Sequence, residues 1–514
     1  MAKTGMERLE ELRKELFKCI HCKACRFAYS NEPDREGIGE FAGKQGTVLY
    51  EGMVDACPAG IEYGWEAFWN AGKMWIARSI LSGDLEFSEE VRDVFLPCIT
   101  CGQCSAQCEN KVPTVDIIES LRAACIEAGI PMIDKHEVVD KLVKERNNPY
   151  GGAAADRFKW AKDAGLEKFI DNKDAKIAYY VGCTASYRQV EVAIATAKLF
   201  EQLGMNFTLI NDEVCCGSPF FRIGAVDTAQ GLMRKNLEAF KNIEMVYFSC
   251  AGCYRTFTID YPKWMAEDEK LPFKTQHAFE LVSNLISYAK KKRELPAKIE
   301  DLKNQVKQNK RLLGELKRSE AEYERVKDFK GEIKFKPNKE LKGKVVTYHD
   351  PCHTGRHFAI DMEQQMIKES DNLWVDNRAI DKAIEAWYEV PRIILRKLEE
   401  DVGLVFKEMY RIKIDSMCCG AGGGVRAGYP EFSLRTASLR CDEANAVEAD
   451  ILTTECPFCW RNLSDANDMY EHGMKVLGIL QMITEYNLLE IINKPTEEDF
   501  LTPSIREDIG HLPK

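Results

Sequence analysis

The sequence predicts an α/β protein in which a mostly α-helical N-terminal domain is followed by two repeated, Rossmann-like α/β domains. Apolar residues recur at helical spacing within the first 146 residues. From residue 174 onward, short β-rich runs alternate with amphipathic helices, a pattern typical of a parallel sheet. The order of these runs, with a matching set of cysteines, then occurs a second time between residues 343 and 494.

Length and composition are those of a globular protein. The chain has 514 residues, enough for roughly three domains of about 150 residues each. Its net charge of −11 argues against a nucleic-acid partner, because phosphates are bound by an excess of basic residues. No apolar run reaches the ~18–20 residues that cross a bilayer, and the charged N-terminus has no apolar signal core. We therefore expect a cytoplasmic protein whose membrane contacts are made through a partner.

The N-terminal domain, residues 1–146, contains two runs of closely spaced cysteines that predict iron–sulfur clusters. Three thiolates at x2 spacing lie on one loop and can hold three corners of an iron–sulfur cube. In two-cluster ferredoxins, the fourth cysteine of such a run ligates the other cluster. One expected ligand set is Cys19, Cys22, Cys25 and Cys108, and the other is Cys57, Cys98, Cys101 and Cys104. Zinc sites would favour two C-x2-C pairs in each group, so the triplets favour iron–sulfur.

The first α/β repeat is expected over residues 174–289. Its β-rich runs lie at residues 176–182, 207–210 and 245–248, and a helix that ends near Gly204 follows the first of them. The cysteines of this repeat are Cys183, Cys215, Cys216, Cys250 and Cys253. Each follows a predicted strand, and ligands of open α/β sheets bind outside the carboxyl ends of the strands.

The second α/β repeat, residues 343–494, has the same order. Its strands are expected at residues 344–348, near 412–414 and at 450–454. Its cysteines are Cys352, Cys418, Cys419, Cys456 and Cys459. Two further cysteines, Cys125 and Cys441, continue the apolar spacing of helices and are interpreted as core residues.

Each repeat therefore reads C … CCG … C-x2-C, with five thiolates at one sheet edge. A structural zinc would use four of them and leave one idle, and this would have to happen twice. A disulfide between adjacent cysteines would be strained. Five thiolates, two of them from neighbouring residues, suit a more open iron–sulfur assembly. The glycines after each pair allow the backbone to come close to such a group.

These motifs resemble the cysteine-rich CCG domains of the heterodisulfide reductase family. The phrases YHDPCH, around Cys352, and CCGAGGG, from Cys418 onward, look like the second repeat of that family. The region from Cys19 to Cys108 is similar to the ferredoxin domain that is fused to these repeats in the D-type subunit. It is also similar to related subunits of anaerobic glycerol-3-phosphate, glycolate and lactate dehydrogenases.

The resemblance implies a function and a set of cofactors. It implies two cubane [4Fe–4S] clusters that relay electrons and one or two noncubane [4Fe–4S] clusters in the CCG domains. The disulfide of coenzyme M and coenzyme B would be cleaved between the noncubane clusters, with electrons from a membrane cytochrome b partner. The alternative is a non-catalytic electron-transfer subunit between a dehydrogenase or flavoprotein and a membrane quinone or cytochrome. The chain has no G-x-G-x-x-G fingerprint after a strand, so flavin and NAD are expected on another subunit.

Two features outside the ligand sets have competing interpretations. In YHDPCHTGRH, His353 and Arg356 are candidates for proton delivery or for contact with an anionic thiol, although a turn that shields the cluster would look the same. The stretch of residues 290–342 is expected to form a charged helix or helical hairpin, either a solvated linker or a docking arm. Residues 495–514 are expected to form a C-terminal tail.

Overall fold

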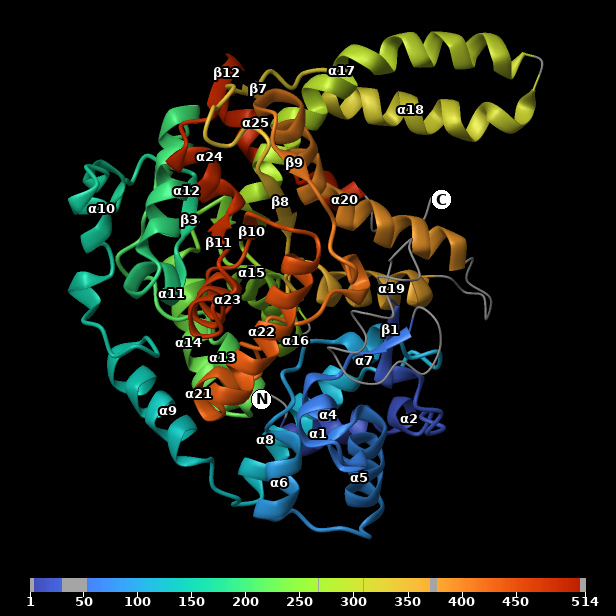
Figure 1. Cartoon of the computed structure of the whole chain (residues 1–514), viewed down its shortest axis with the longest axis vertical. Helices are drawn as coiled ribbons and strands as arrows, with labels where there is room; N and C mark the ends of the chain where they lie inside the picture. Colours follow the sequence, from blue (N-terminus) through green and yellow to red (C-terminus); the bar gives the residue numbers. More distant parts are fainter. Residues whose placement is uncertain (1–3, 30–52, 267, 308, 370–376, 509–514) are drawn as a thin grey trace.

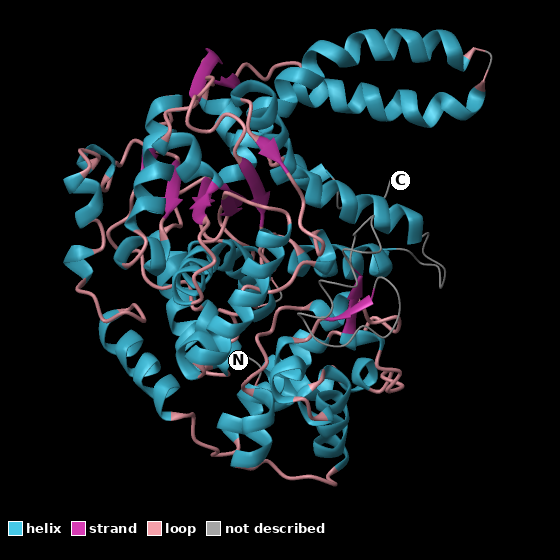
Figure 2. Ribbon diagram, viewed as in Figure 1, coloured by secondary structure: helices cyan, strands magenta, loops and turns pink. Residues whose placement is uncertain are grey.

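The computed structural model describes residues 4–29, 53–266, 268–307, 309–369 and 377–508. It confirms the expected class: a helical N-terminal region lies below two α/β halves, each built on a parallel sheet (Figure 1). Helices surround both sheets (Figure 2). None of the helices in these residues is long and apolar enough to cross a membrane.

The N-terminal region is made of short helices around one small β-ribbon. The ribbon pairs β1 (Phe27–Tyr29) with β2 (Met53–Asp55) in antiparallel register. The helices are α1 (Gly5–Glu11), α2 (Arg13–Leu16), α4 (Pro58–Tyr63), α5 (Asn70–Ser82), α6 (Glu89–Phe95), α7 (Gln103–Ala106) and α8 (Thr114–Glu127). A cluster of buried side chains from α1, α5, α6 and α8 holds these helices together. Next in the chain, α9 (Asp134–Arg146) runs along the outside toward the first α/β half (Figure 1).

The first half contains a four-stranded parallel sheet in the order β4-β3-β5-β6. Its strands are β3 (Ile177–Tyr180), β4 (Phe207–Thr208), β5 (Met245–Phe248) and β6 (Lys274–His277). Its helices are α10 (Lys159–Asp163), α11 (Gly182–Tyr187), α12 (Val190–Leu203), α13 (Ser218–Ile223), α14 (Val226–Ala239), α15 (Ala251–Arg255) and α16 (Tyr261–Trp264). Every residue of β3 and β5 is buried, as expected for strands covered on both faces.

The second half repeats this topology in the order β9-β8-β10-β11. Its strands are β8 (Val345–Tyr348), β9 (Val405–Phe406), β10 (Ile451–Thr454) and β11 (Lys475–Gly478). Its helices are α19 (Arg356–Glu369), α20 (Asn377–Val402), α21 (Val425–Gly428), α22 (Pro430–Ala446), α23 (Pro457–Met469) and α24 (Ile479–Glu485). The internal repeat inferred from the cysteines is therefore also a repeat of sheet topology.

The strand expected near residues 412–414 was wrong. The edge strand of the second sheet is β9, several residues earlier, and residues 413–415 form a 3-10 turn. Lys413 has a positive φ of 56°, which no strand tolerates. Its backbone N–H donates to the Asp350 carboxylate at 2.8 Å instead of to a neighbouring strand.

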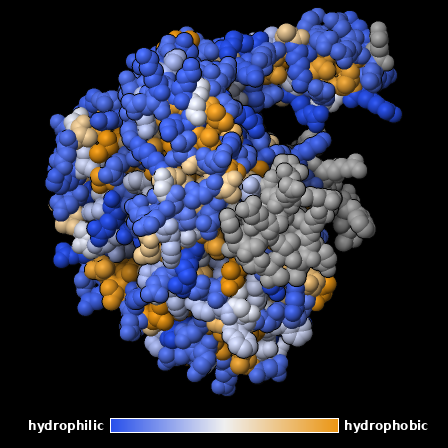
Figure 3. Space-filling view, in the orientation of Figure 1, coloured by the Kyte–Doolittle hydropathy of each residue, from blue (hydrophilic) through white to orange (hydrophobic). Residues whose placement is uncertain are grey.

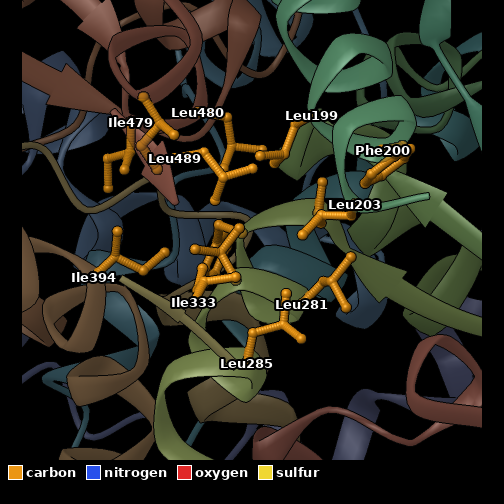
Figure 4. Close-up of a cluster of buried hydrophobic side chains, with 14 of the residues drawn as sticks. Leu199, Phe200, Leu203, Leu281, Leu285, Ile333, Ile394, Ile479, Leu480 and Leu489 are labelled. Carbon is orange, nitrogen blue, oxygen red and sulfur yellow. The ribbon is translucent and has the colours of Figure 1, made fainter. Parts of the chain in front are cut away.

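The two halves share one core. A single cluster of buried apolar side chains takes residues from both sheets and from the helices between them (Figure 4). It includes Leu199 of α12, Leu281 of α17 (Ala278–Val306), Ile394 of α20 and Leu480 of α24. An antiparallel pair of β7 (Glu332–Phe335) with β12 (Leu489–Asn493) lies over this core.

A helical hairpin projects from the body, next to this small sheet (Figure 1). It consists of the distal part of α17 and α18 (Leu313–Val326), which pack against each other. Most of the stretch expected to be charged and helical is this hairpin, but β7 also lies within that stretch. After β12 the chain forms α25 (Glu497–Leu501) and returns to the body.

Candidate metal centres and the cavity between them

The eight cysteines of the N-terminal region form two groups in the structure. Cys19, Cys22, Cys25 and Cys108 line one small cavity beside α5. Burial raises the pKa of the Cys25 thiol to about 12. Cys22 is the exposed member of this group. The crossed grouping expected from the spacing is therefore the one that the chain brings together in space.

The second N-terminal group lies deeper and joins Cys57 to the run at residues 98–104. Cys57 lies near Cys98 and Cys101, and burial raises its pKa to about 11. Cys104 lies near both Cys98 and Cys101, and its Sγ is 2.9 Å from the Thr114 hydroxyl. Cys25 of the first group is also close enough to raise the pKa of Cys104, so the two groups are neighbours.

The five cysteines of the first half converge at the carboxyl edge of its sheet. Cys183 starts α11 just after β3, and Cys250 caps α15 just after β5. The buried thiols form a continuous series of neighbours that shift one another's pKa, in the order Cys183, Cys215, Cys216, Cys253, Cys250. All of them are free thiols, so the adjacent pair Cys215–Cys216 is not a disulfide.

The second half places its five cysteines in the same way. Cys456 caps α23 just after β10, as Cys250 caps α15. The series of contacting thiols runs Cys352, Cys418, Cys419, Cys459, Cys456. As in the first half, the adjacent pair remains reduced.

Two contacts between thiols connect these groups. Cys250 of the first half and Cys456 of the second lie close enough to shift each other's pKa. Cys101 of the N-terminal region lies next to Cys418, and this neighbour lowers the pKa of Cys101 to about 6 against the opposing effect of burial. The cysteine groups therefore form one sequence, from the partly exposed group at Cys22 to the first α/β half.

A cavity of about 320 Å³ lies between the two five-cysteine sets. Nine of their ten cysteines line it, and Cys418 is the exception. Small residues of the cysteine motifs form much of the wall, for example Gly252 between Cys250 and Cys253 and Ala421 after the second CCG. Tyr150, Arg426 and Arg461 contribute polar groups.

Of the two candidate catalytic residues, only His353 lines the cavity. Burial, and then the nearby Arg255 and Arg222, lower the pKa of His353 to about 3, so its imidazole is neutral near pH 7. Arg356 lies outside the cavity lining. Its guanidinium donates to three backbone carbonyls, those of Cys101, Ile414 and Ser416. This geometry favours a role in fastening the N-terminal region to the CCG loop of the second half.

The two five-cysteine sets differ in one neighbouring side chain. In the second half, the Nδ1 atom of His349 accepts a hydrogen bond of 3.2 Å from Arg440 Nε, which leaves the proton of the neutral ring on Nε2. A ring nitrogen of His349 lies within 4.8 Å of the sulfur atoms of Cys419 and Cys459, and since Nδ1 is taken by Arg440 we assign this position to Nε2. The equivalent position of the first half is Tyr180, whose hydroxyl donates its proton to the Val214 carbonyl at 2.6 Å instead of to the nearby sulfurs of Cys216 and Cys253.

The residues around both sets fit an iron–sulfur group. Thiolates are soft ligands, and no carboxylate accompanies them among the described residues of the cavity wall. The buried Nε2 of His349 has no hydrogen-bond partner within the described residues, although it faces the sulfurs, as expected for a donor aimed at a bound group. Gly182 has a φ of 76°, and a Cβ atom there would lie 2.9 Å from the Cys253 sulfur. A side chain at that position would fill space next to the thiols.

Several residues near the thiols were not identified from the sequence. Arg157 forms a buried ion pair with Glu213 at 2.8 Å and also donates to the Cys183 sulfur at 3.6 Å. Arg122 donates to carbonyls that include those of Cys98 and Gly423, so it joins the N-terminal region to the second CCG loop. Both arginines lie outside the cysteine motifs, and only their contacts across the fold reveal their place.

Comparison with known proteins agrees with these groups. The family model of a 4Fe-4S dicluster domain matches residues 15–112, and that of a cysteine-rich domain matches residues 177–258 and 382–464. The chain is 32% identical to the D subunit of dihydromethanophenazine:CoB–CoM heterodisulfide reductase from Methanosarcina mazei. That similarity covers 82% of this chain and 85% of the relative. The chain belongs to the family of heterodisulfide reductase D subunits.

Members of this wider group of iron–sulfur proteins carry different names. The B subunit of fumarate reductase (CoM/CoB) from Methanothermobacter marburgensis is 27% identical over 75% of this chain and 60% of its own length. The EtfAB:quinone oxidoreductase of Syntrophomonas wolfei is 22% identical over 80% of this chain and 48% of its own length. The chain is thus an iron–sulfur electron-transfer protein of the oxidoreductase class, and the resemblance inferred from its motifs is confirmed.

Proposed function

We propose that this chain reduces a small-molecule disulfide, such as the coenzyme M–coenzyme B heterodisulfide, in the cavity between its two five-cysteine sets. The observation that carries the proposal is that both sets face one cavity and contact each other through Cys250 and Cys456. The reaction is R–S–S–R′ + 2 e⁻ + 2 H⁺ → R–SH + R′–SH. The cavity, at about 320 Å³, falls within the usual range of small-molecule sites, roughly 300–1,000 Å³.

The proposed cofactors are two cubane [4Fe–4S] clusters on the N-terminal groups and one noncubane [4Fe–4S] cluster on one or both five-cysteine sets. When bound, they would supply single electrons and iron atoms with affinity for sulfur. The contact of Cys101 with Cys418 supports entry of electrons into the second half first. The contact of Cys250 with Cys456 supports passage from there to the first half.

The chain's own residues have defined tasks in this proposal. The mostly apolar walls of the cavity suit a small organic molecule, and the glycines of the second CCG loop leave room next to the sulfurs. His353, as a neutral imidazole, can donate a hydrogen bond from its ring N–H to a departing thiolate, and the proton that the thiol gains is taken from water as the product leaves. Arg356 does not contact the cavity, and we assign it to holding Cys101 against the second CCG loop.

The electron donor is proposed to be a partner protein. Cys22 is exposed, so the first N-terminal group is the place at which a donor can approach. A membrane cytochrome b or a flavoprotein fits this role, because relatives carry the names of single subunits within redox enzymes. A membrane cytochrome b as the partner would also place the complex at a membrane.

A second candidate function is electron transfer without disulfide chemistry. The observation in its favour is the name of the Syntrophomonas wolfei relative, an EtfAB:quinone oxidoreductase, which shares the iron–sulfur region. In this function the same sequence of cysteine groups would link a dehydrogenase or flavoprotein to a membrane quinone or cytochrome. The cavity would then have no substrate.

The test uses anaerobically purified protein. It asks whether narrowing the cavity stops disulfide reduction while electron transfer to the clusters is kept. Gly252 lines the cavity, and a Cβ there makes only ordinary contacts, 3.4 Å from His353 and 3.7 Å from Cys250. Gly252→Val would therefore narrow the cavity without removing a ligand. Gly231→Val, at a position of α14 with nothing within 4 Å, is the matched control.

We expect both variants to keep their iron and sulfide content and their reduction by dithionite. With the coenzyme M–coenzyme B disulfide, the wild type and Gly231→Val should release both thiols, and Gly252→Val should release at least tenfold less. Full iron content without thiol release from the wild type would reject disulfide reduction of this substrate and favour the second candidate. Unchanged release from Gly252→Val would reject the cavity as the site.

A further inference from the structure

The projecting hairpin is an arm with its own small core. Four apolar side chains that face each other between α17 and α18 are buried, namely Leu295, Ile299, Leu302 and Leu316. Ion pairs cross between the helices, among them Lys298–Glu315 at 3.0 Å and Lys303–Glu320 at 3.3 Å. The arm lies at the opposite end of the view from the N-terminal region (Figure 1). Its outer surface is mostly hydrophilic (Figure 3).

The arm carries a charge opposite to that of the rest of the chain. Residues 290–330 contain 14 lysines and arginines but 8 aspartates and glutamates, a net charge of +6 in a chain of net charge −11. Such segregation is not needed for the stability of a helical hairpin. It is an electrostatic property that favours approach of this one element to an anionic surface.

The excess positive charge gathers at the tip. Five exposed basic side chains surround the turn: Lys307, Lys310, Arg311, Lys317 and Arg318. Within the described part of the chain, none of these five forms an ion pair with an acidic side chain, in contrast to the lysines further down the arm. Leu313, the first residue of α18, lies among them with 44% of its surface exposed.

We propose that this tip, defined by Lys307, Lys310, Arg311, Leu313, Lys317 and Arg318, binds the surface of an anionic lipid bilayer. Unpaired basic side chains beside an exposed leucine are the combination that draws a peripheral segment to anionic lipid. A stable protein interface would require a larger patch with aromatic anchors or pockets. The tip has neither, since its described residues are flexible basic chains around one leucine. The inference is independent of the proposed disulfide chemistry.

Sedimentation with vesicles of phosphatidylglycerol and phosphatidylcholine tests the proposal on the full-length protein. The double variant Lys310→Gln/Arg311→Gln removes two charges of the tip. The matched control Lys162→Gln/Lys173→Gln removes two exposed lysines of the first half that form no ion pair in the described residues. Each basic residue near an anionic surface changes the binding constant about fivefold.

We expect the wild type and the control to bind the anionic vesicles at low salt. The tip variant should bind roughly 25-fold more weakly, since two such charges are lost. None of these three proteins should bind vesicles of pure phosphatidylcholine. Added salt should weaken binding to the anionic vesicles. Leu313→Ser should reduce the binding that remains at higher salt. Iron content and circular dichroism should be unchanged in all variants, because the substituted side chains are exposed.

Two results would overturn the proposal. The first is absence of binding to anionic vesicles, or equal binding by the tip variant. The second is retention of the wild type on immobilised polyglutamate without binding to the vesicles, which would assign the tip to an acidic protein instead.

Discussion

At the scale of single residues, the two five-cysteine sets are not equivalent. His349 aims a ring N–H at the sulfurs of the second set, and its orientation is fixed by Arg440. Tyr180, at the same place in the first half, donates to a backbone carbonyl. Hydrogen bonds to the sulfurs raise the reduction potential of an iron–sulfur cluster, because they stabilise the more negative, reduced state.

Replacement of His349 by asparagine should therefore lower the midpoint potential of the cluster on the second set. A hydrogen bond to a charged group contributes about 1.5 kcal/mol, which for one electron corresponds to roughly 60 mV. A redox titration followed by EPR measures this shift. Tyr180→Phe is the matched control and should leave the potential of the first set unchanged. An equal shift in both variants would contradict the assigned role of His349.

Residue types and spacing were sufficient to predict which cysteines lie together. They were not sufficient to predict what the side chains next to those cysteines contact. The x2 spacing predicted the two triplets, because short loops limit where thiols can lie, and the crossed ligation of two-cluster ferredoxins predicted the fourth cysteine of each group. Arg356 shows the limit. Its position next to a cysteine motif suggested contact with a substrate, yet its donors are taken by carbonyls from two distant segments. Those carbonyls become neighbours only in the folded chain.

At the scale of elements, α9 connects the N-terminal region to the CCG loop of the second half. His136 of α9 makes a 2.9 Å hydrogen bond from Nε2 to the Gly424 carbonyl. Its Nδ1 is buried and has no partner within the described residues. Burial therefore lowers the pKa of His136 to about 4, because a second proton on the ring would be poorly solvated.

This contact predicts a dependence of stability on pH. The unfolded chain protonates His136 near pH 6.5 but the folded chain only near pH 4, so the unfolded state binds more protons between these values. Stability from this residue is complete above about pH 6.5 and falls as the pH decreases toward 4. For His136→Gln, the free energy of unfolding obtained from denaturation curves should fall less between pH 7 and pH 5 than it does for the wild type. Identical slopes in the two proteins would contradict the assignment.

Strands and helices with strong local signals were predicted well, and the weak ones were not. The buried strands β3, β5, β8 and β10 coincide with the apolar runs that precede the cysteines. The edge strand β9 was placed too late, since two residues carry little signal and an isoleucine pair further on resembles a strand. The pair of β7 and β12 was missed because its strands lie about 150 residues apart in the sequence.

At the scale of the whole molecule, the C-terminal segment fastens the two halves together. Arg506 forms a buried ion pair of 3.0 Å with Glu280 at the start of α17. It also donates to the carbonyl oxygens of Thr354 and Trp387 in the second half. Glu280 has no exposed surface, so it depends on this partner for its charge. The segment expected to be a C-terminal tail therefore includes a residue, Arg506, that helps to hold the two halves together.

Arg506→Ala should destabilise the whole protein rather than its end. Loss of one partner of a buried ion pair costs about 3–5 kcal/mol, and the shared core transmits the loss to both halves. Chemical denaturation under anaerobic conditions should show a lower midpoint with a single transition. Lys494→Ala, at an exposed position, is the control and should have little effect. A separate early transition of one half would contradict a common core.

The internal repeat has one more consequence. Two identical protein chains related by a twofold axis would have to place identical groups on both sides of their interface. Here each side of the cavity belongs to a different stretch of one polypeptide, so a tyrosine can stand where its counterpart is a histidine. Such a site is free to treat the two ends of a bound molecule differently. A disulfide with two unlike halves is the kind of molecule for which that freedom matters.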